Sequence, residues 1–262
     1  MRKFISTEKI KELINKDTKI IPSIFLLILL VLWQFVVDIG LIERYILPSP
    51  KNIILTLIKI LPEIKIHVVA TLQEAILGFS IAIILSIILA VLMDSIKIIK
   101  KAIYPLLIIS QTVPIIALAP LFMMWFGLGK LPKIIVVVLV CFFPIVISLL
   151  DGLESVDKDM LNLIKSMGGS KFQIFKIVKF PSSIVSFFSG LRIAATYSIM
   201  GAVIGEWLGG KEGLGLYMLR AKHAFKLDKV FAVIIVIVIL SMTLFKIISL
   251  MQYLFMPWTR ES

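Results

Sequence analysis

Residues 134–150 read IIVVVLVCFFPIVISLL, an apolar run without a charged side chain and with one hydroxyl residue, Ser148. A helix of about 20 mostly apolar residues is long enough to cross the hydrocarbon core of a bilayer. A helix is also favoured there, because it pairs its own backbone polar groups where no water is present. The run therefore predicts a transmembrane helix.

Five further stretches meet the same criterion. The whole chain of 262 residues is 60% hydrophobic, with a mean hydropathy of +1.06, whereas soluble domains are roughly 45–50% apolar. These observations predict an all-α, polytopic membrane protein with about six transmembrane helices. The other five are expected at Ile20–Ile39, Val68–Met93, Ile103–Phe126, Ser183–Trp207 and Val230–Phe255.

The basic residues lie mainly in short segments between the apolar runs. Lys and Arg number 28 against 16 Asp and Glu, a formal charge of +12. This distribution indicates membrane topology rather than nucleic-acid binding, because Lys and Arg accumulate in cytoplasmic segments. With the N-terminus inside, fifteen basic residues fall on the cytoplasmic side and eleven outside. We therefore expect the N-terminus in the cytoplasm.

The N-terminal third is expected to contain three parts. Residues 1–19 form a cytoplasmic tail and residues 20–39 a first anchor, which lacks a cleavage site of the signal-peptide kind. Residues 40–66 form an outer connection. Within it, Ser49 and Pro50 can begin an amphipathic helix in the outer interface.

The sequence offers little for chemistry or metal binding. Cys141, the one cysteine, lies in an apolar run and is expected to be a small buried side chain. His67 and His223 are far apart and are interpreted as interfacial, so no metal site or cofactor is expected. Neither 127–130 nor 168–171 has the spacing of a phosphate-binding loop. The chain is therefore not expected to be an enzyme, and any ATP that drives it is bound by another subunit.

A short cytoplasmic helix is predicted between the fourth and fifth spans. Met160, Leu163, Ile164 and Met167 recur at the spacing of one helical face. Asp157 can cap the start of this helix.

A turn and a second helix follow. Gly168 and Gly169 can end the first helix, because glycine readily adopts the left-handed conformation. Ser170 can then cap a second helix that runs to Pro181. By pattern alone, this hairpin is either an interfacial element or a docking site for a partner protein.

The stretch at 167–181, MGGSKFQIFKIVKFP, has a glycine followed thirteen residues later by a proline. It resembles the signature loop of binding-protein-dependent ABC importer permeases. Further matches are LPSP at 47–50, ALAPLF at 117–122, WFG at 125–127, SGLR at 189–192, GEW at 205–207 and GLG at 213–215. The resemblance extends over about 47–258 and is to the branch that imports nitrate, sulfonates, taurine and thiamine-precursor pyrimidines. One departure is that Asn162, Leu163 and Ile164 replace the usual Glu-Ala-Ala of the loop, which leaves the charge contact of that glutamate open.

The resemblance implies a bacterial inner-membrane permease whose transmembrane domain covers residues 67–258, with a coupling hairpin at 157–181. It also implies a homodimer surrounded by membrane lipid, two ABC ATPase subunits and an extracytoplasmic solute-binding protein. The residues expected to dock the ATPase are Met160, Leu161, Leu163, Ile164, Met167, Gly168, Gly169, Ser170 and Lys171.

Polar residues inside the spans are candidates to line the path, because such groups are costly at membrane depth unless they face protein or water. Hydroxyl groups can instead bond to their own helix backbone. Glu74 and Glu206 are interpreted as interfacial groups rather than solute ligands. The candidates for the path are Gln111, Thr112, Ser148, Thr196, Tyr197 and Ser198.

The charge pattern also bears on the solute. Arg192 and Lys246 are expected near helix ends, so the span interiors offer no central cation. This favours a neutral heteroaromatic solute such as a thiamine-precursor pyrimidine. A sulfonate, taurine or nitrate stays as the alternative, since helix dipoles can hold anions. An ion-coupled secondary carrier fits less well, because no relay of charged residues and no inverted repeat is visible in the sequence.

Overall fold

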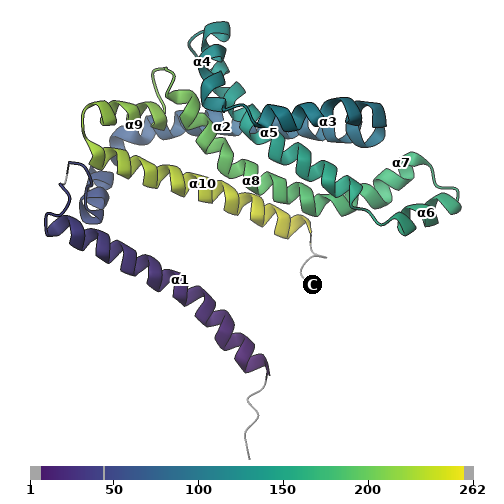
Figure 1. The fold of residues 1–262 in the computed structure, drawn as a ribbon, viewed down its shortest axis with the longest axis horizontal. Coiled ribbons are helices and arrows are strands. Elements are labelled where there is room, and N and C mark those ends of the chain that lie inside the picture. Colours follow the sequence, from purple (N-terminus) through teal and green to yellow (C-terminus); the bar gives the residue numbers. More distant parts are fainter. Residues whose placement is uncertain (1–6, 44, 257–262) are drawn as a thin grey trace, which may run out of the picture. The chain divides into compact units, whose positions relative to one another are not determined.

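The computed structural model describes residues 7–43 and 45–256, with side chains from residue 21 onwards. This part of the chain is helical and contains no strand (Figure 1). Its elements are α1 (Thr7–Asp38), α2 (Pro50–Ser95), α3 (Lys97–Gln111), α4 (Ile115–Phe126), α5 (Lys130–Glu154), α6 (Lys158–Ser166), α7 (Lys171–Ile174), the π-helical turn η1 (Phe175–Lys179), α8 (Phe180–Glu206), α9 (Leu214–His223) and α10 (Leu227–Phe255).

The number of membrane spans agrees with the sequence pattern. Five helical segments in the described residues are long and apolar enough to cross a bilayer, and the bent pair α3 and α4 makes a sixth. The continuous segments are Ile21–Asp38, Pro50–Ser95, Lys130–Glu154, Lys171–Glu206 and Leu227–Phe255. The prediction of an all-α membrane protein with about six spans is confirmed.

Helix α2 covers both the amphipathic segment after Ser49 and the second predicted span. The Ser49 hydroxyl accepts a hydrogen bond from the Asn52 amide (3.3 Å), as expected for a cap. The helix then continues for 46 residues without a break at residues 66–67. Pro62 lies between the two predicted segments, yet α2 continues through it.

The third predicted span, Ile103–Phe126, is broken rather than merely kinked. Helix α3 ends at Gln111, α4 begins at Ile115, and the two helices are bent by 102°. Pro114 lies at the start of α4 with φ −63° and ψ 116°. Proline disfavours the helical conformation in the residue before it, here Val113, which explains why α3 cannot continue.

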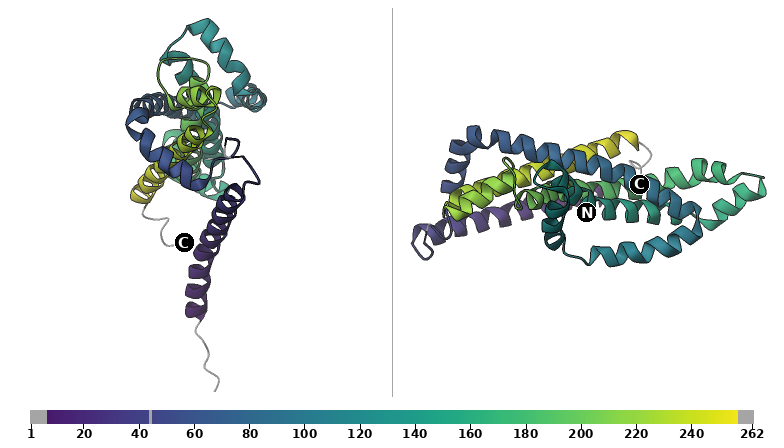
Figure 2. Two further views of the ribbon diagram at one scale, coloured as in Figure 1. Left: turned by 90° about the vertical axis from the view of Figure 1, so that its left-hand side faces the viewer. Right: turned by 90° about the horizontal axis from the view of Figure 1, so that it is seen from above.

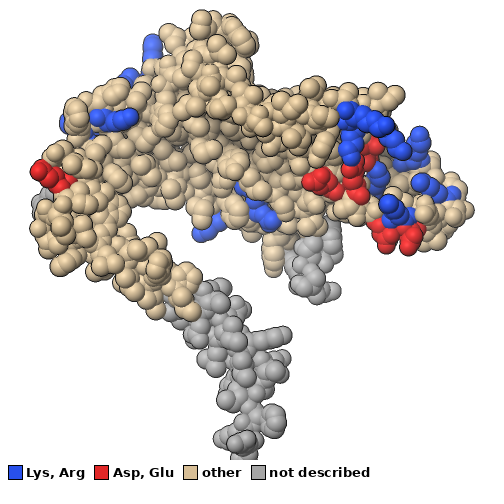
Figure 3. Space-filling view, viewed as in Figure 1, with Lys and Arg blue, Asp and Glu red and all other residues tan. Residues whose placement is uncertain are grey.

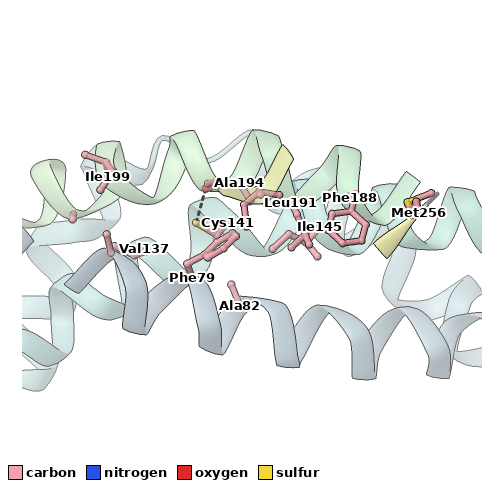
Figure 4. Close-up of a cluster of buried hydrophobic side chains, with 14 residues drawn as sticks. Phe79, Ala82, Val137, Cys141, Ile145, Phe188, Leu191, Ala194, Ile199 and Met256 are labelled. Atoms are coloured by element: carbon pink, nitrogen blue, oxygen red, sulfur yellow. Dashed lines mark hydrogen bonds between the residues drawn. The ribbon is translucent and has the colours of Figure 1, made fainter. Parts of the chain in front are cut away.

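The core of the bundle lies between α5 and α8, with α2 and α10 packed against it. Figure 1 shows α5 and α8 side by side, Figure 2 gives two further views of the bundle, and Figure 4 shows side chains of both helices in one buried cluster. A Cβ on Gly190 would lie 2.6 Å from the Pro144 carbonyl oxygen, so glycine permits this close approach. Cys141 is fully buried, and its thiol donates to the Ala194 carbonyl (3.3 Å), as predicted for a small core residue.

The chain divides into two compact units. One consists of residues 1–61 and 221–232, and the other of residues 62–220 and 233–262. In the described part of the first unit, the Trp33 and Phe231 rings lie 5.8 Å apart, and the Thr56 hydroxyl donates to Asp228 (2.9 Å). The candidate site described next belongs wholly to the second unit.

Candidate functional site

Local capping signals fix the geometry of the hairpin formed by α6 and α7. The Asp157 carboxylate accepts from the Asp159 amide (2.9 Å) at the start of α6. At its end Gly168 has φ +80°, and the Gly169 amide donates to the Ile164 carbonyl (2.9 Å). This pattern closes the helix as in other glycine-terminated helices.

The second helix of the hairpin begins with a reciprocal cap. The Ser170 hydroxyl accepts from the Gln173 amide (3.3 Å), and the Gln173 side chain accepts from the Ser170 amide (2.7 Å). From Lys171 onwards the chain stays helical through η1 to Glu206. The hairpin is therefore joined to α8 without a loop, and the helix–turn–helix prediction matches the structure.

The hairpin carries an apolar face that no described residue covers. Met160 is 53% exposed, Leu163 61% and Met167 79%. Leu161 and Ile164 are instead half-buried, with Ile164 packed against the Gly169 turn. Contiguous exposed apolar side chains typically mark an interaction site. Of the predicted docking residues, Met160, Leu163 and Met167 are thus best placed to meet a partner.

A cavity of about 520 Å³, the membrane pocket, lies between α3, α4, α5 and α8. Three of the six predicted path residues line it, namely Gln111, Ser148 and Tyr197. Ser110 adds a hydroxyl, Phe143 adds an aromatic ring, and no charged residue lines this cavity. The pocket can therefore offer hydrogen bonds and an aromatic surface to a solute.

The other three predicted path residues lie outside the membrane pocket. The hydroxyls of Thr112, Thr196 and Ser198 bond to carbonyls of their own helices, at 2.7, 2.7 and 2.8 Å. Ser198 is also fully buried. These residues agree with the alternative interpretation, in which a hydroxyl group donates its hydrogen bond to a backbone carbonyl of its own helix.

A second polar cluster, the acidic network, connects α2 and α8 to the segment that begins α9. The Thr71 hydroxyl donates to one oxygen of Glu206 (2.6 Å), and the Gly215 amide donates to the other (2.6 Å). Glu206 is fully buried. The Leu214 amide donates to the Thr71 hydroxyl (2.9 Å), which closes the network on α2.

Two further contacts flank the acidic network. The Lys133 ammonium donates to Glu74 (2.9 Å) in a buried ion pair. The Gly213 amide donates to Nδ1 of His67 (3.0 Å). A buried charge is tolerated only when it is paired or hydrogen-bonded. Both oxygens of Glu206 accept hydrogen bonds, whereas Glu74 is paired through Oε1 and its buried Oε2 has no hydrogen-bond partner among the described residues.

Residues 82–261 match the family model described as the binding-protein-dependent transport system inner membrane component. The chain belongs to this family. It is therefore a permease component of an ABC transporter, a multi-pass protein of the cell membrane. Family membership implies an ATPase partner and a solute-binding protein, and it places the permease among transport components rather than catalytic subunits.

Named relatives of the permease cover most of its length. A formylaminopyrimidine transport permease protein of Halalkalibacterium halodurans is 38% identical over 92% of this chain and 96% of its own. A riboflavin transport system permease protein of Chloroflexus aurantiacus is 32% identical over 89% and 88%. A taurine transport system permease protein of Escherichia coli is 28% identical over 90% and 88%. The predicted resemblance to this branch is confirmed.

A solved structure supports the fold of the permease. An amino acid ABC transporter, crystallised with histidines, aligns with a TM-score of 0.63 and 17% identity. The alignment covers 76% of this chain and 97% of that one. At this identity the likeness concerns the fold alone.

Three basic residues of the permease lie elsewhere than the sequence predicted, and one of them, Lys246, is inside α10, nine residues before its end at Phe255. Arg192 lies in the middle of α8, not near a helix end, where its guanidinium donates to the side chains of Gln252 and Ser189. It ties α8 to α10 and does not line the membrane pocket. Lys133 is one of the eleven basic residues expected in the outer segments, and it is buried in α5 beside Glu74. Arg192 and Lys133 each bind a polar side chain that is distant in sequence, Gln252 and Glu74 respectively.

The acidic network is the part of the permease that sequence reasoning missed. Glu206 was interpreted as an interfacial anchor, yet it accepts hydrogen bonds from two segments. One signal was available, because a glycine-rich segment at 213–215 leaves backbone amides that need an acceptor. An acidic residue shortly before that segment is a suitable acceptor.

Proposed function

We propose that two copies of this permease form the solute path of an importer, with an ATPase docked on each hairpin. ATP is hydrolysed in the ATPase and not in this chain. The proposal rests mainly on the uncovered apolar face of Met160, Leu163 and Met167, held on a capped hairpin. The hairpin and the N-terminus lie in the cytoplasm in this proposal, as the charge bias favours.

The hairpin is suited to pass movement to the path. Residues from Lys171 to Glu206 form one helical segment, so a displacement of the hairpin acts directly on α8. Helix α8 contributes Tyr197 to the membrane pocket. Closure of the ATPase pair would thereby alter the pocket and switch its opening between the two sides of the membrane. Solute then arrives from an extracytoplasmic binding protein.

A neutral heteroaromatic solute, such as a thiamine-precursor pyrimidine, fits the membrane pocket best. Its lining combines Gln111, Ser148 and Tyr197 with aromatic and aliphatic side chains and has no charge. Arg192 precedes the lining residue Ile193 in the sequence, but its guanidinium donates to Gln252 of α10. The relative with 38% identity is named for formylaminopyrimidine transport, which points the same way.

A sulfonate, taurine or nitrate is the second candidate solute, because relatives named for sulfonates and taurine also match this chain. The permease, its ATPase and its own binding protein, reconstituted in liposomes, distinguish the two. We expect ATP-dependent accumulation of a formylaminopyrimidine. Accumulation of taurine or an alkanesulfonate, with none of the pyrimidine, would overturn this choice.

A further inference from the structure

A lysine-rich cavity of about 690 Å³, the lysine pocket, lies where α2 and α5 end and where α3 and α6 begin. Figure 3 shows that charged side chains gather at this end of the unit, around α6 and α7. Two carboxylates, Asp94 and Glu154, also line the cavity, which leaves an excess of three positive charges. Its lysines are Lys97, Lys100, Lys101, Lys158 and Lys179.

Both carboxylates are already engaged by two of the lysines. Asp94 accepts from Lys179 at 2.5 Å, and Glu154 accepts from Lys100. Among the described residues, no carboxylate forms an ion pair with the other three lysines, Lys97, Lys101 and Lys158. Three ammonium groups therefore border one cavity without a fixed counterion. Such a concave cluster concentrates positive potential and attracts anions.

The walls of the lysine pocket are apolar as well as basic. Met93, Leu153 and Leu161 line it, and Ile98, next to Lys97, is 79% exposed. Helices α2 and α5 are among the most apolar spans of the chain, and both end at this cavity. The pocket thus lies at the boundary between hydrocarbon and water, at the level of lipid head groups. Its chemistry suits a ligand with an anionic head and hydrocarbon chains.

We propose that the lysine pocket binds the phosphate group of an anionic phospholipid from the surrounding bilayer. Lys97, Lys101 and Lys158 contact the phosphate, while the pairs Asp94–Lys179 and Glu154–Lys100 hold the walls. Basic pockets at the ends of membrane helices are a known form of head-group recognition. The acyl chains lie along the exposed apolar side chains at the start of α3. This site is separate from the membrane pocket.

Native mass spectrometry of the full chain in detergent tests the proposal. The protein is titrated with phosphatidylglycerol, with phosphatidylcholine and with inorganic phosphate. We expect selective binding of phosphatidylglycerol. The combined variant Lys97→Gln, Lys101→Gln, Lys158→Gln should lose about tenfold or more of that affinity, given three favourable charge contacts.

The matched control is Lys165→Gln, Lys171→Gln, Lys176→Gln, which removes the same charge from exposed lysines of the same end that do not line the cavity. It should bind phosphatidylglycerol like the wild type. Thermal unfolding of both variants confirms that they remain folded. Equal loss in both variants, or no preference for phosphatidylglycerol, would overturn the proposal. Binding of inorganic phosphate without lipid selectivity would also overturn it, by assigning the site to a soluble anion.

Discussion

At the scale of single residues, Glu206 is a fully buried carboxylate whose replacement should have a clear effect on stability. Its carboxylate accepts from the Thr71 hydroxyl and the Gly215 amide, each at 2.6 Å. It thereby joins α8, α2 and the start of α9. These hydrogen bonds stabilise the packing of α8, α2 and the start of α9. A substitution of Glu206 would leave the buried Thr71 hydroxyl or Gly215 amide without its acceptor.

Glu206→Gln is expected to lower the stability of the permease. The glutamine keeps one oxygen in place of the two carboxylate oxygens, so its NH2 group then faces the Thr71 hydroxyl or the Gly215 amide, which are both donors. Leaving a buried group unpaired costs about 1–3 kcal/mol, which corresponds to a melting temperature lower by roughly 2–10 °C. Thermal unfolding in detergent measures the change.

Glu212→Gln is the control, because the Glu212 side chain is exposed. It should unfold at the wild-type temperature. If Glu206→Gln does the same, the acidic network does not hold the start of α9 to α2 and α8.

Tyr197 is the residue through which the membrane pocket is best tested. Tyr197→Ala removes an aromatic surface and a hydroxyl from the cavity. Together these contribute about 1–2 kcal/mol to binding, so uptake at low solute concentration should fall roughly 5- to 30-fold. Co-purification of the ATPase should not change. Initial rates of ATP-dependent uptake by the reconstituted complex provide the measurement.

Thr196→Val serves as the neighbouring control, since the Thr196 hydroxyl bonds to the Ile193 carbonyl and does not line the pocket. It should transport nearly as well as the wild type. A larger effect of Thr196→Val than of Tyr197→Ala would place the path elsewhere on α8.

At the scale of elements, the hairpin was predictable because its signals are local. Asp157, Gly168 and Ser170 each act on backbone groups within five residues, so their spacing alone indicates two helices and a turn. The Glu74–Lys133 pair joins residues 59 positions apart, and Thr71–Glu206 joins residues 135 apart. Such pairs form only when helices pack, and the hydropathy pattern of the sequence does not predict them.

The break between α3 and α4 and the unbroken course of α2 also could not be predicted in detail from the sequence. Pro114 lies at the break in the third predicted span, but the 102° bend depends on how α4 packs against α5 and α8. Helix α2 runs through the expected boundary at residue 66, because a change from amphipathic to apolar sequence does not itself interrupt a helix. Element types were therefore more predictable than their ends and angles.

Gly168→Pro should abolish ATPase binding while the chain still inserts into the membrane. Proline cannot adopt the observed φ of +80°, and it removes the amide that donates to the Lys165 carbonyl (3.0 Å). The turn would then reorient α6. Co-purification of the ATPase with the tagged permease measures docking.

Gly40→Pro is the matched control, because Gly40 also has a positive φ (+76°) but lies in the connection after α1. This variant should retain the ATPase. Loss of the ATPase from both variants, or from neither, would argue against a specific role of the hairpin turn.

At the scale of the whole molecule, the proposed function requires one orientation in the membrane. The hairpin must face the cytoplasm, where ATP is available, and the segment at 208–213 must face outwards. Lys165→Cys should therefore react with an impermeant thiol reagent in inside-out vesicles only, and Lys211→Cys in intact cells only. Cys141 is fully buried and should stay unlabelled in both. Labelling of Lys165→Cys in intact cells would contradict the predicted orientation, because the hairpin would then face outwards.

Leu163 provides the most direct test of the central claim, that an ATPase drives this permease through the hairpin. The Leu163 side chain is 61% exposed on the hairpin, and Leu128, in the connection between α4 and α5, is 81% exposed. The measurement is ATP-dependent solute uptake by the reconstituted complex, with ATPase retention recorded on the same samples. We expect Leu163→Asp to lose both, because a carboxylate would be desolvated in the interface, while Leu128→Asp retains both. Wild-type uptake by Leu163→Asp would contradict the account.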